Sequence, residues 1–233
     1  MNHPQITPQF DWNDIDTVLL DMDGTLLDRH FDDYFWEHYV PEQYAALHGL
    51  DLAHAKVELL AKYKGHEGTL AWTDLDFWSD QLGLDIPILK MEIDHLIAVH
   101  PYVPDFLRFC RAIGKKVYLV TNAHSKTLDI KMNKTALAGH FDRIICAEEV
   151  GLAKEVPEFW VRLEKMLGFQ KERTMLGDDT EKVLVSAAEY GMGYLIYVAR
   201  PSSQKPIAYS ARFPSIVYFK ELIELHPAPN LTR

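Results

Sequence analysis

The stretch TVLLDMDGT, residues 17–25, joins a run of β-branched and aliphatic residues to two aspartates and a glycine. The apolar run at 17–20 is typical of a buried strand whose two faces are both covered. The run stops at Asp21, and Gly24 permits the sharp turn that must follow. We therefore expect a strand that ends in a turn and presents acidic side chains at its carboxyl end.

Similar apolar runs recur along the chain and alternate with helical patterns. Runs that stop at polar residues lie at 116–120, 143–146, 174–176 and 194–198, and helical spacing occurs at 104–112, 125–137, 156–167 and 180–190. This alternation predicts an α/β fold with a doubly wound parallel sheet, whose ligands bind beyond the carboxyl ends of the strands. We also expect a short edge strand near Ile216 and a final helix near 219–225.

The stretch from 31 to 100 interrupts the alternation, because it contains four helix-like segments and no convincing strand. We predict helices at roughly 31–48, 52–63, 73–83 and 86–97. We interpret the stretch as an all-helical cap, inserted into an α/β catalytic core of residues 1–30 and 101–233. Most of its aromatic residues should pack the helices together, and one or two that face the crevice could stack on a base. These aromatic residues are Tyr34, Phe35, Trp36, Tyr39, Trp72, Phe77 and Trp78.

The composition disfavours several classes of partner. The 233 residues carry a formal net charge of −10, so attraction to a nucleic acid polymer or to an anionic membrane is disfavoured. The polar stretch 1–16 has neither the apolar centre of a signal peptide nor the length of a membrane span. Cys110 and Cys146 lack the spacing of metal ligands, and we expect reduced thiols in a cytoplasmic protein.

Asp21 and Asp23 form a pair of carboxylates with one residue between them. A carboxylate can act as a nucleophile toward phosphorus, and a neighbouring carboxylic acid can protonate the leaving oxygen. An isolated pair of this kind could instead be two turn or capping aspartates. The apolar strand before the pair and the glycine and threonine after it favour the catalytic interpretation.

In this context the sequence resembles the haloacid dehalogenase superfamily, whose four short motifs occur here in order. The first motif matches Asp21 to Thr25. The second is a strand that ends in Thr or Ser, and it matches Val117 to Thr121, with Asn122 beside it. The third is a lysine before a helix, and it matches Lys154, because Pro157 suits the first turn of a helix.

The fourth motif is acidic and follows a strand, and it matches Asp178 and Asp179. Many members of the superfamily have a further aspartate four residues after the first, where this chain has Lys182. Asp179 or Glu181 could replace that acid behind the metal ligands, although Asp179 could also simply cap the next helix. The long spacing between the first two motifs places the cap there, as in the phosphoglycolate phosphatase and phosphoglucomutase-like branch.

The resemblance implies a Mg²⁺-dependent phosphohydrolase in which Asp21 attacks a small phosphate ester. Several carboxylates would repel a phosphate dianion, so a hard divalent cation must lie among them, and oxygen ligands favour Mg²⁺. The implied ligands are Asp21, the carbonyl group of Asp23 and Asp178. Thr121 and Lys154 are expected to stabilise the transferring phosphoryl group, and Lys154 is the only fixed cation that the motifs place nearby. Groups expected to bind the phosphate belong to Gly24, Thr121, Asn122 and Lys154.

Within the superfamily the sequence is especially similar to the bacterial GMP/IMP nucleotidase subgroup, through residues 18–28, 31–36 and 121–124. This similarity predicts purine nucleoside 5′-monophosphates as substrates. The alternatives are a phosphatase of small sugar phosphates or phosphoglycolate, a phosphomutase, a dehalogenase and a protein that binds without catalysis. Asp23 argues against a dehalogenase, which needs no acid at that position. We expect a monomer or a weak homodimer.

Overall fold

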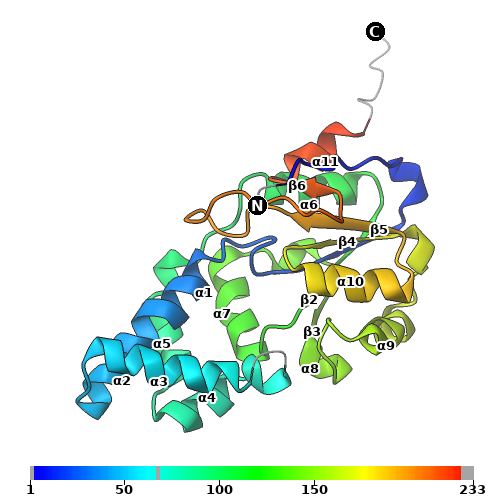
Figure 1. Cartoon of the computed structure of the whole chain (residues 1–233). Helices are drawn as coiled ribbons and strands as arrows, with labels where there is room; N and C mark the ends of the chain where they lie inside the picture. The colour runs from blue at the N-terminus through cyan, green and yellow to red at the C-terminus, as the bar shows by residue number, and fades with distance from the viewer. Residues whose placement is uncertain (1–2, 67–68, 227–233) are drawn as a thin grey trace.

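The computed structural model describes residues 3–66 and 69–226, and a parallel sheet of six strands forms its centre (Figure 1). The strand order is β3-β2-β1-β4-β5-β6, and the winding reverses at β1, with β2 and β3 on one side and β4 to β6 on the other. The predicted doubly wound sheet is therefore confirmed, including its edge strand. The strands are β1 (Thr17–Leu20), β2 (Lys116–Thr121), β3 (Arg143–Cys146), β4 (Thr174–Asp178), β5 (Tyr194–Val198) and β6 (Ser215–Ile216).

Helices cover both faces of the sheet. Along β1, Val18 and Leu20 pack in one core with α6 and α11, whereas Leu19 packs in a second core with α9 and α10. This alternation follows from the period of two in strand side chains, and it explains why every residue of β1 must be buried. The helices of this part are α6 (Val103–Ala112), α7 (Ser125–Thr135), α8 (Ala147–Val150), α9 (Pro157–Leu167), α10 (Glu181–Tyr190) and α11 (Lys220–Glu224), with short helices at Trp12–Asp14, Ala138–His140 and Lys171–Arg173.

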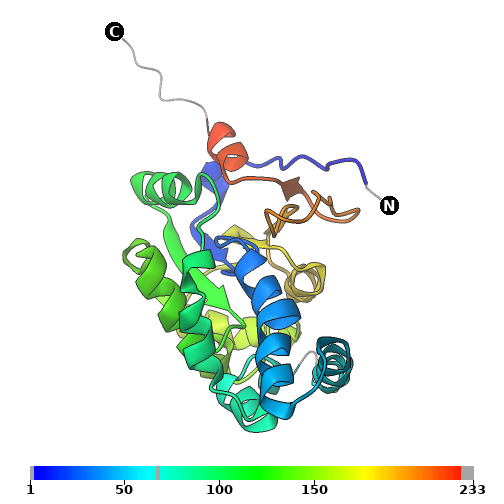
Figure 2. The same ribbon diagram turned by 90° about the vertical axis from the view of Figure 1, so that its left-hand side faces the viewer.

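Residues 30–96, between β1 and β2, form the helical insertion. The two views show it at the opposite end of the molecule from α11 (Figures 1 and 2). The helix expected at 31–48 contains a π-helical turn, because Pro41 has no N–H to donate and its ring crowds the carbonyl group four residues before it. The elements are α1 (His30–Tyr34), the π turn η2 (Phe35–Tyr39), α2 (Val40–His48), α3 (Leu52–Lys64), η3 (Leu70–Trp72), α4 (Leu75–Leu82), α5 (Ile86–Glu92) and η4 (Asp94–Leu96).

The two chain segments that join the insertion to the sheet run side by side. Leu27 and Val99 form an antiparallel bridge. The N–H groups of Asp28 and His100 donate to the carbonyl oxygens of Ala98 and Leu26, each over 2.9 Å. The division into core and cap stays a prediction.

The sequence also led to expectations about the two cysteines and about membrane-spanning segments. Cys110 and Cys146 are both buried and free, as expected for small core residues. Among the residues that the structure describes, no helix has the length and apolar character to cross a membrane. The cytoplasmic location and the oligomeric state expected above stay predictions.

Candidate active site

Three of the expected residues meet where the winding of the sheet reverses. β1 lies between β2 and β4, so the residues at the carboxyl ends of these strands are neighbours. Asp21 follows β1, Thr121 ends β2 and Asp178 ends β4, and all three side chains are buried. The N–H group of Asp21 donates to the carbonyl oxygen of Gly177 over 3.0 Å, which ties the acidic loop to β4.

Lys154 joins two of these strand ends. Its Nζ lies 2.5 Å from Asp21 Oδ1 and 2.7 Å from Asp178 Oδ2, and it donates to the carbonyl oxygen of Val120 over 3.2 Å. The side chain is only 3% exposed, so it is a fixed cation and not a solvated surface lysine. The loop that carries Lys154 ends where α9 begins at Pro157, in agreement with the helix start predicted from the sequence.

Burial shifts the pKa values of Asp21, Asp178 and Lys154. It raises the pKa of Asp21 to about 6, although the Lys154 ammonium opposes the shift, and it also raises the pKa of Asp178. Burial lowers the pKa of Lys154, but the charges of Asp178 and Asp21 more than offset this and raise it above its ordinary value. Lys154 is therefore held in its charged form between carboxylates that are costly to ionise.

The acidic residues fit a divalent cation. One carboxylate oxygen from each of Asp21, Asp178 and Asp179 lies within 4.8 Å of the other two, and all three residues are buried. An all-oxygen set of this kind suits a hard cation such as Mg²⁺, whose charge would relieve the cost of ionising buried carboxylates. Asp179 thus lies close enough to be a ligand, in addition to the supporting role predicted for it. The carboxylate of Asp23 pairs with Lys131 and does not belong to this cluster. The role predicted for the carbonyl group of Asp23 stays a prediction.

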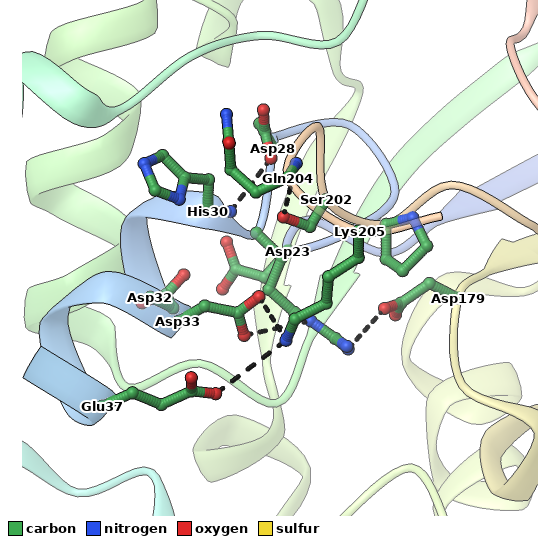
Figure 3. Close-up of polar contacts among 12 residues, drawn as sticks. Asp23, Asp28, His30, Asp32, Asp33, Glu37, Asp179, Ser202, Gln204 and Lys205 are labelled. Atoms are coloured by element: carbon green, nitrogen blue, oxygen red, sulfur yellow. Dashed lines mark hydrogen bonds and ion pairs between the residues drawn. The ribbon is translucent and has the colours of Figure 1, made fainter. Parts of the chain in front are cut away.

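Asp179 lies against the segment that follows β1. Its Oδ2 accepts from Arg29 Nη1 over 2.7 Å, and a dashed line marks this contact of Asp179 in Figure 3. Gly24, at φ +84°, approaches so closely that a Cβ there would lie 2.3 Å from Asp179 Oδ2. The glycine is therefore required at this position by contact with Asp179 as well as by the turn.

Asp23 belongs to a separate network. Its Oδ1 accepts from Lys131 Nζ over 2.5 Å, and the same ammonium donates to Asp32 Oδ2 over 2.5 Å. Burial raises the pKa of Asp23 to about 6, against the opposing charge of Lys131 and with the help of Asp32 and Asp21. The expectation that Lys154 would be the only nearby cation is wrong, because Lys131 and Arg29 also pair with acids of the site. Neither belongs to a motif that could have revealed it.

The side chains of Thr121 and Asn122 have different hydrogen-bond partners. Thr121 Oγ1 accepts from the N–H of Ala123 over 3.0 Å, which orients the hydroxyl at the end of β2. Both ends of the Asn122 amide are engaged by the lysine loop: Oδ1 accepts from Lys154 N, and Nδ2 donates to Glu155 Oε2 over 2.9 Å. The side chain of Asn122 therefore positions Lys154, and its predicted phosphate contact would be made by its backbone.

A cleft of about 500 Å³ separates these strand ends from the helical insertion. Of the seven aromatic residues named in the sequence analysis, Trp36, Trp72 and Trp78 line this cleft, which is more than the one or two expected. Phe35 and Trp78 are almost completely buried, whereas Trp72 is 37% exposed. The insertion also brings polar groups to the cleft. The residues of the insertion and its linker that line it include Arg29, Asp33, Trp36, Glu37, Tyr63, Trp72, Thr73, Trp78 and Lys90.

Comparison with known proteins identifies the family. The sequence model of the haloacid dehalogenase-like hydrolases matches residues 15–191, a span that contains every residue of the site described above. The chain belongs to this family. It is 38% identical, over 91% of its length and 96% of the relative's, to the GMP/IMP nucleotidase YrfG of Escherichia coli (strain K12). It is 25% identical to the pyrophosphatase PpaX of Bacillus pumilus, over 75% of this chain and 79% of that one.

Solved structures of haloacid dehalogenase-like proteins share the fold. A phosphatase of the family from Thermococcus onnurineus superposes with a TM-score of 0.76 at 22% identity, covering 91% of this chain and 97% of that one. The L-2-haloacid dehalogenase of Xanthobacter autotrophicus superposes with a TM-score of 0.58 at 18% identity, over 91% and 98% of the two chains. Family membership and the nucleotidase relative together make the chain a phosphatase of this family.

Proposed function

We propose that the protein hydrolyses purine nucleoside 5′-monophosphates with the aid of Mg²⁺, through an aspartyl-phosphate formed on Asp21. The observation that supports this most directly is the convergence of Asp21, Thr121, Lys154 and Asp178 at one point. They lie beneath a cleft whose other wall is the helical insertion. A nucleophile, a fixed cation and an acid cluster that fits Mg²⁺ are the parts that phosphoryl transfer requires.

The chemistry divides into two displacements. In the first, a carboxylate oxygen of Asp21 forms a bond to phosphorus while the bond to the leaving oxygen breaks, and the Asp23 carboxyl group gives that oxygen a proton. In the second, the Asp23 carboxylate takes a proton from water, the water oxygen attacks phosphorus, and the carboxylate of Asp21 is released. The raised pKa of Asp23 favours the protonated form that the first step needs.

The remaining groups stabilise charge. The Lys154 ammonium is fixed beside Asp21, so it faces the phosphoryl oxygens without having to reorganise. The hydroxyl of Thr121 and the backbone N–H of Asn122 provide further donors at the end of β2. When bound among Asp21, Asp178 and Asp179, Mg²⁺ would neutralise the acids and polarise the phosphoryl group.

Two observations support the choice of substrate: the similarity to the YrfG nucleotidase and the residues that line the cleft. The YrfG nucleotidase is described as acting on GMP and IMP, and this chain aligns with 96% of its length. The cleft offers the partly exposed ring of Trp72 for stacking, with Asp33 and Glu37 as acceptors for the edges of a base. A volume of about 500 Å³ lies within the range of small-molecule sites.

The test is phosphate release from IMP, UMP, ribose 5-phosphate and phosphoglycolate, with and without Mg²⁺. We expect kcat/KM to be highest for IMP and activity to vanish with a chelator. If ribose 5-phosphate matches IMP, the base is not recognised and the protein is a phosphatase of small sugar phosphates. If phosphoglycolate is preferred, the nucleotide assignment also fails. Transfer of phosphate between substrate positions without release would indicate a phosphomutase.

A further inference from the structure

A chain of alternating charges, in which both lysines are buried and both aspartates are partly exposed, leads from Asp23 into the helical insertion. Lys131 Nζ lies 2.5 Å from Asp23 Oδ1 and 2.5 Å from Asp32 Oδ2, and Lys90 Nζ lies 2.9 Å from the other oxygen of Asp32. The Lys131 and Lys90 side chains are 1% and 2% exposed. The four residues thus form an alternating series of two carboxylates and two ammonium groups.

The members of this chain come from both sides of the cleft. Asp23 lies in the loop after β1, and Lys131 lies on α7; both belong to the part that contains the sheet. Asp32 lies on α1 and Lys90 on α5, both in the insertion. Figure 3 shows Asp32 on its helix and Asp23 on the neighbouring loop. The ion pair between Lys131 and Asp32 therefore crosses the boundary between the sheet part and the insertion.

Stability does not explain such an arrangement. Removing lysines from water carries a large desolvation cost, and well-packed apolar residues would often serve the fold as well. Buried ion pairs are better suited to holding groups in one geometry. Here the rings of Phe31 and Phe35 enclose the ammonium groups, at 5.3 Å from Lys131 and 4.6 Å from Lys90, which narrows their freedom further.

We propose that Lys131 is a positioning residue that holds the carboxyl group of Asp23 toward the leaving oxygen, and that Asp32 holds Lys131 in place from the insertion. This inference rests on the proposed function, because it takes Asp23 to be the acid of the first step. Without Lys131, the carboxylates of Asp23 and Asp32 would face each other with no cation between them. The Asp23 carboxylate would then turn away from the Asp32 carboxylate and lose its alignment with the substrate.

Leaving-group dependence tests this role. The substrates are 4-nitrophenyl phosphate, which leaves as an acidic phenol, and 4-nitrobenzyl phosphate, which leaves as an alcohol and needs a proton. Lys131→Met should lower kcat for the nitrobenzyl ester by at least about 10-fold, as should Asp23→Asn, and kcat for the nitrophenyl ester much less. KM should change little for either ester. Lys131→Arg should recover part of the lost kcat.

A matched control lies on the same helix. Lys134 on α7 also pairs with a residue of the insertion, Asp94, over 3.0 Å, but both side chains are exposed. Lys134→Met should leave kcat for both esters unchanged. An equal loss in Lys134→Met and Lys131→Met would show that any ion pair between α7 and the insertion suffices, and would overturn the positioning role.

Asp32 provides a second, independent variant. Asp32→Asn keeps the Asp23–Lys131 pair and should reproduce part of the selective loss on the nitrobenzyl ester. The double variant Asp32→Asn with Lys131→Met removes one charge of each sign, so it remains informative if Lys131→Met alone fails to fold. Its loss should equal that of Lys131→Met, because both changes act on the same carboxyl group. Losses that multiply would overturn the coupling.

The outcomes separate this inference from the proposed function. If the wild-type protein releases no phosphate from IMP or from either ester, the proposed function fails and the inference falls with it. If the wild type hydrolyses both esters and the Lys131 and Asp32 variants lose both equally, only the inference is overturned. A selective loss on the nitrobenzyl ester, with thermal unfolding and KM near the wild-type values, supports it.

Discussion

The carboxylates of Asp21 and Asp23 pair with different lysines, although only Met22 separates the two residues. Asp21 faces Lys154 on the loop before α9, whereas Asp23 faces Lys131 on α7. Asp21 is thereby joined to the acids that could hold a cation, and Asp23 is joined to the helical insertion. This separation gives two chemically identical side chains the different surroundings that a nucleophile and a proton donor require.

Asp21→Asn should abolish turnover, with a loss of at least about 10³-fold, because the amide is a far weaker nucleophile than the carboxylate. The check is phosphate release together with the acyl-phosphate trapped by acid quenching. Asp105→Asn, which changes an exposed aspartate on α6, is the control and should behave as the wild type. Normal trapping in the Asp21 variant would assign the nucleophile elsewhere.

The raised pKa of Asp21 predicts how stability depends on pH in the presence of a chelator. A carboxyl group with a folded-state pKa of about 6, above its ordinary value of 3.8, stabilises the protein fully below the lower value. That contribution is lost as the pH rises through about 6. Asp21→Asn, which cannot ionise, should therefore gain in Tm relative to the wild type between about pH 4 and about pH 7, by roughly 2–4 °C for each kcal/mol. A Tm difference that stays constant or falls would contradict burial as the cause.

Asp178→Ala should weaken Mg²⁺ binding, because it removes one of three clustered carboxylates. Mg²⁺ should raise the Tm of the wild type, since a ligand that binds only the folded state stabilises it. The variant should need at least about 10-fold more Mg²⁺ for the same rise. Asp105→Ala is the control, because Asp105 is exposed and lies outside this cluster, and it should leave the titration unchanged. Identical titrations for wild type and Asp178→Ala would remove Asp178 from the ligands.

Gly24→Ala should lower the thermal stability and raise the Mg²⁺ requirement, because the new Cβ displaces Asp179. The residue has a φ of +84°, which costs roughly 1–2 kcal/mol for a residue with a Cβ. The new Cβ would also lie 2.9 Å from Pro201 Cβ and still closer to Asp179. Gly139→Ala, where a Cβ would meet nothing within 4 Å, is the matched control. The measurements are thermal unfolding and the Mg²⁺ requirement, and wild-type values for both in Gly24→Ala would refute the close approach.

Trp72→Ala should reduce the preference for nucleotides. Loss of one stacking contact of about 1–3 kcal/mol lowers kcat/KM for IMP by roughly 5–150-fold. Ribose 5-phosphate has no base, so its kcat/KM serves as the internal control and should stay the same. An equal fall for both substrates would mean that Trp72 supports the structure of the insertion and does not read the base.

Much of the fold and part of the site follow from local patterns in the chain. Short apolar runs that alternate with helical spacing specify a parallel sheet, because only strands covered on both faces are apolar at every position. Such a sheet brings its carboxyl ends together, so Asp21, Thr121 and Asp178 become neighbours as soon as their strands are recognised. Lys154 could be found in the same way, since Pro157 marks the start of the next helix.

The partners of the second carboxylate depended on tertiary packing. Lys131 lies 108 residues from Asp23 in the chain and occupies a helix whose sequence resembles any amphipathic helix. Lys90 and Arg29 are likewise single cations without a motif, and a lone lysine or arginine is usually solvated. The docking of the insertion against α7 buries Lys131 and Lys90, and a buried ammonium group needs a carboxylate partner. Local sequence patterns do not predict this long-range pairing, because it depends on how the helices pack and not on their periodicity.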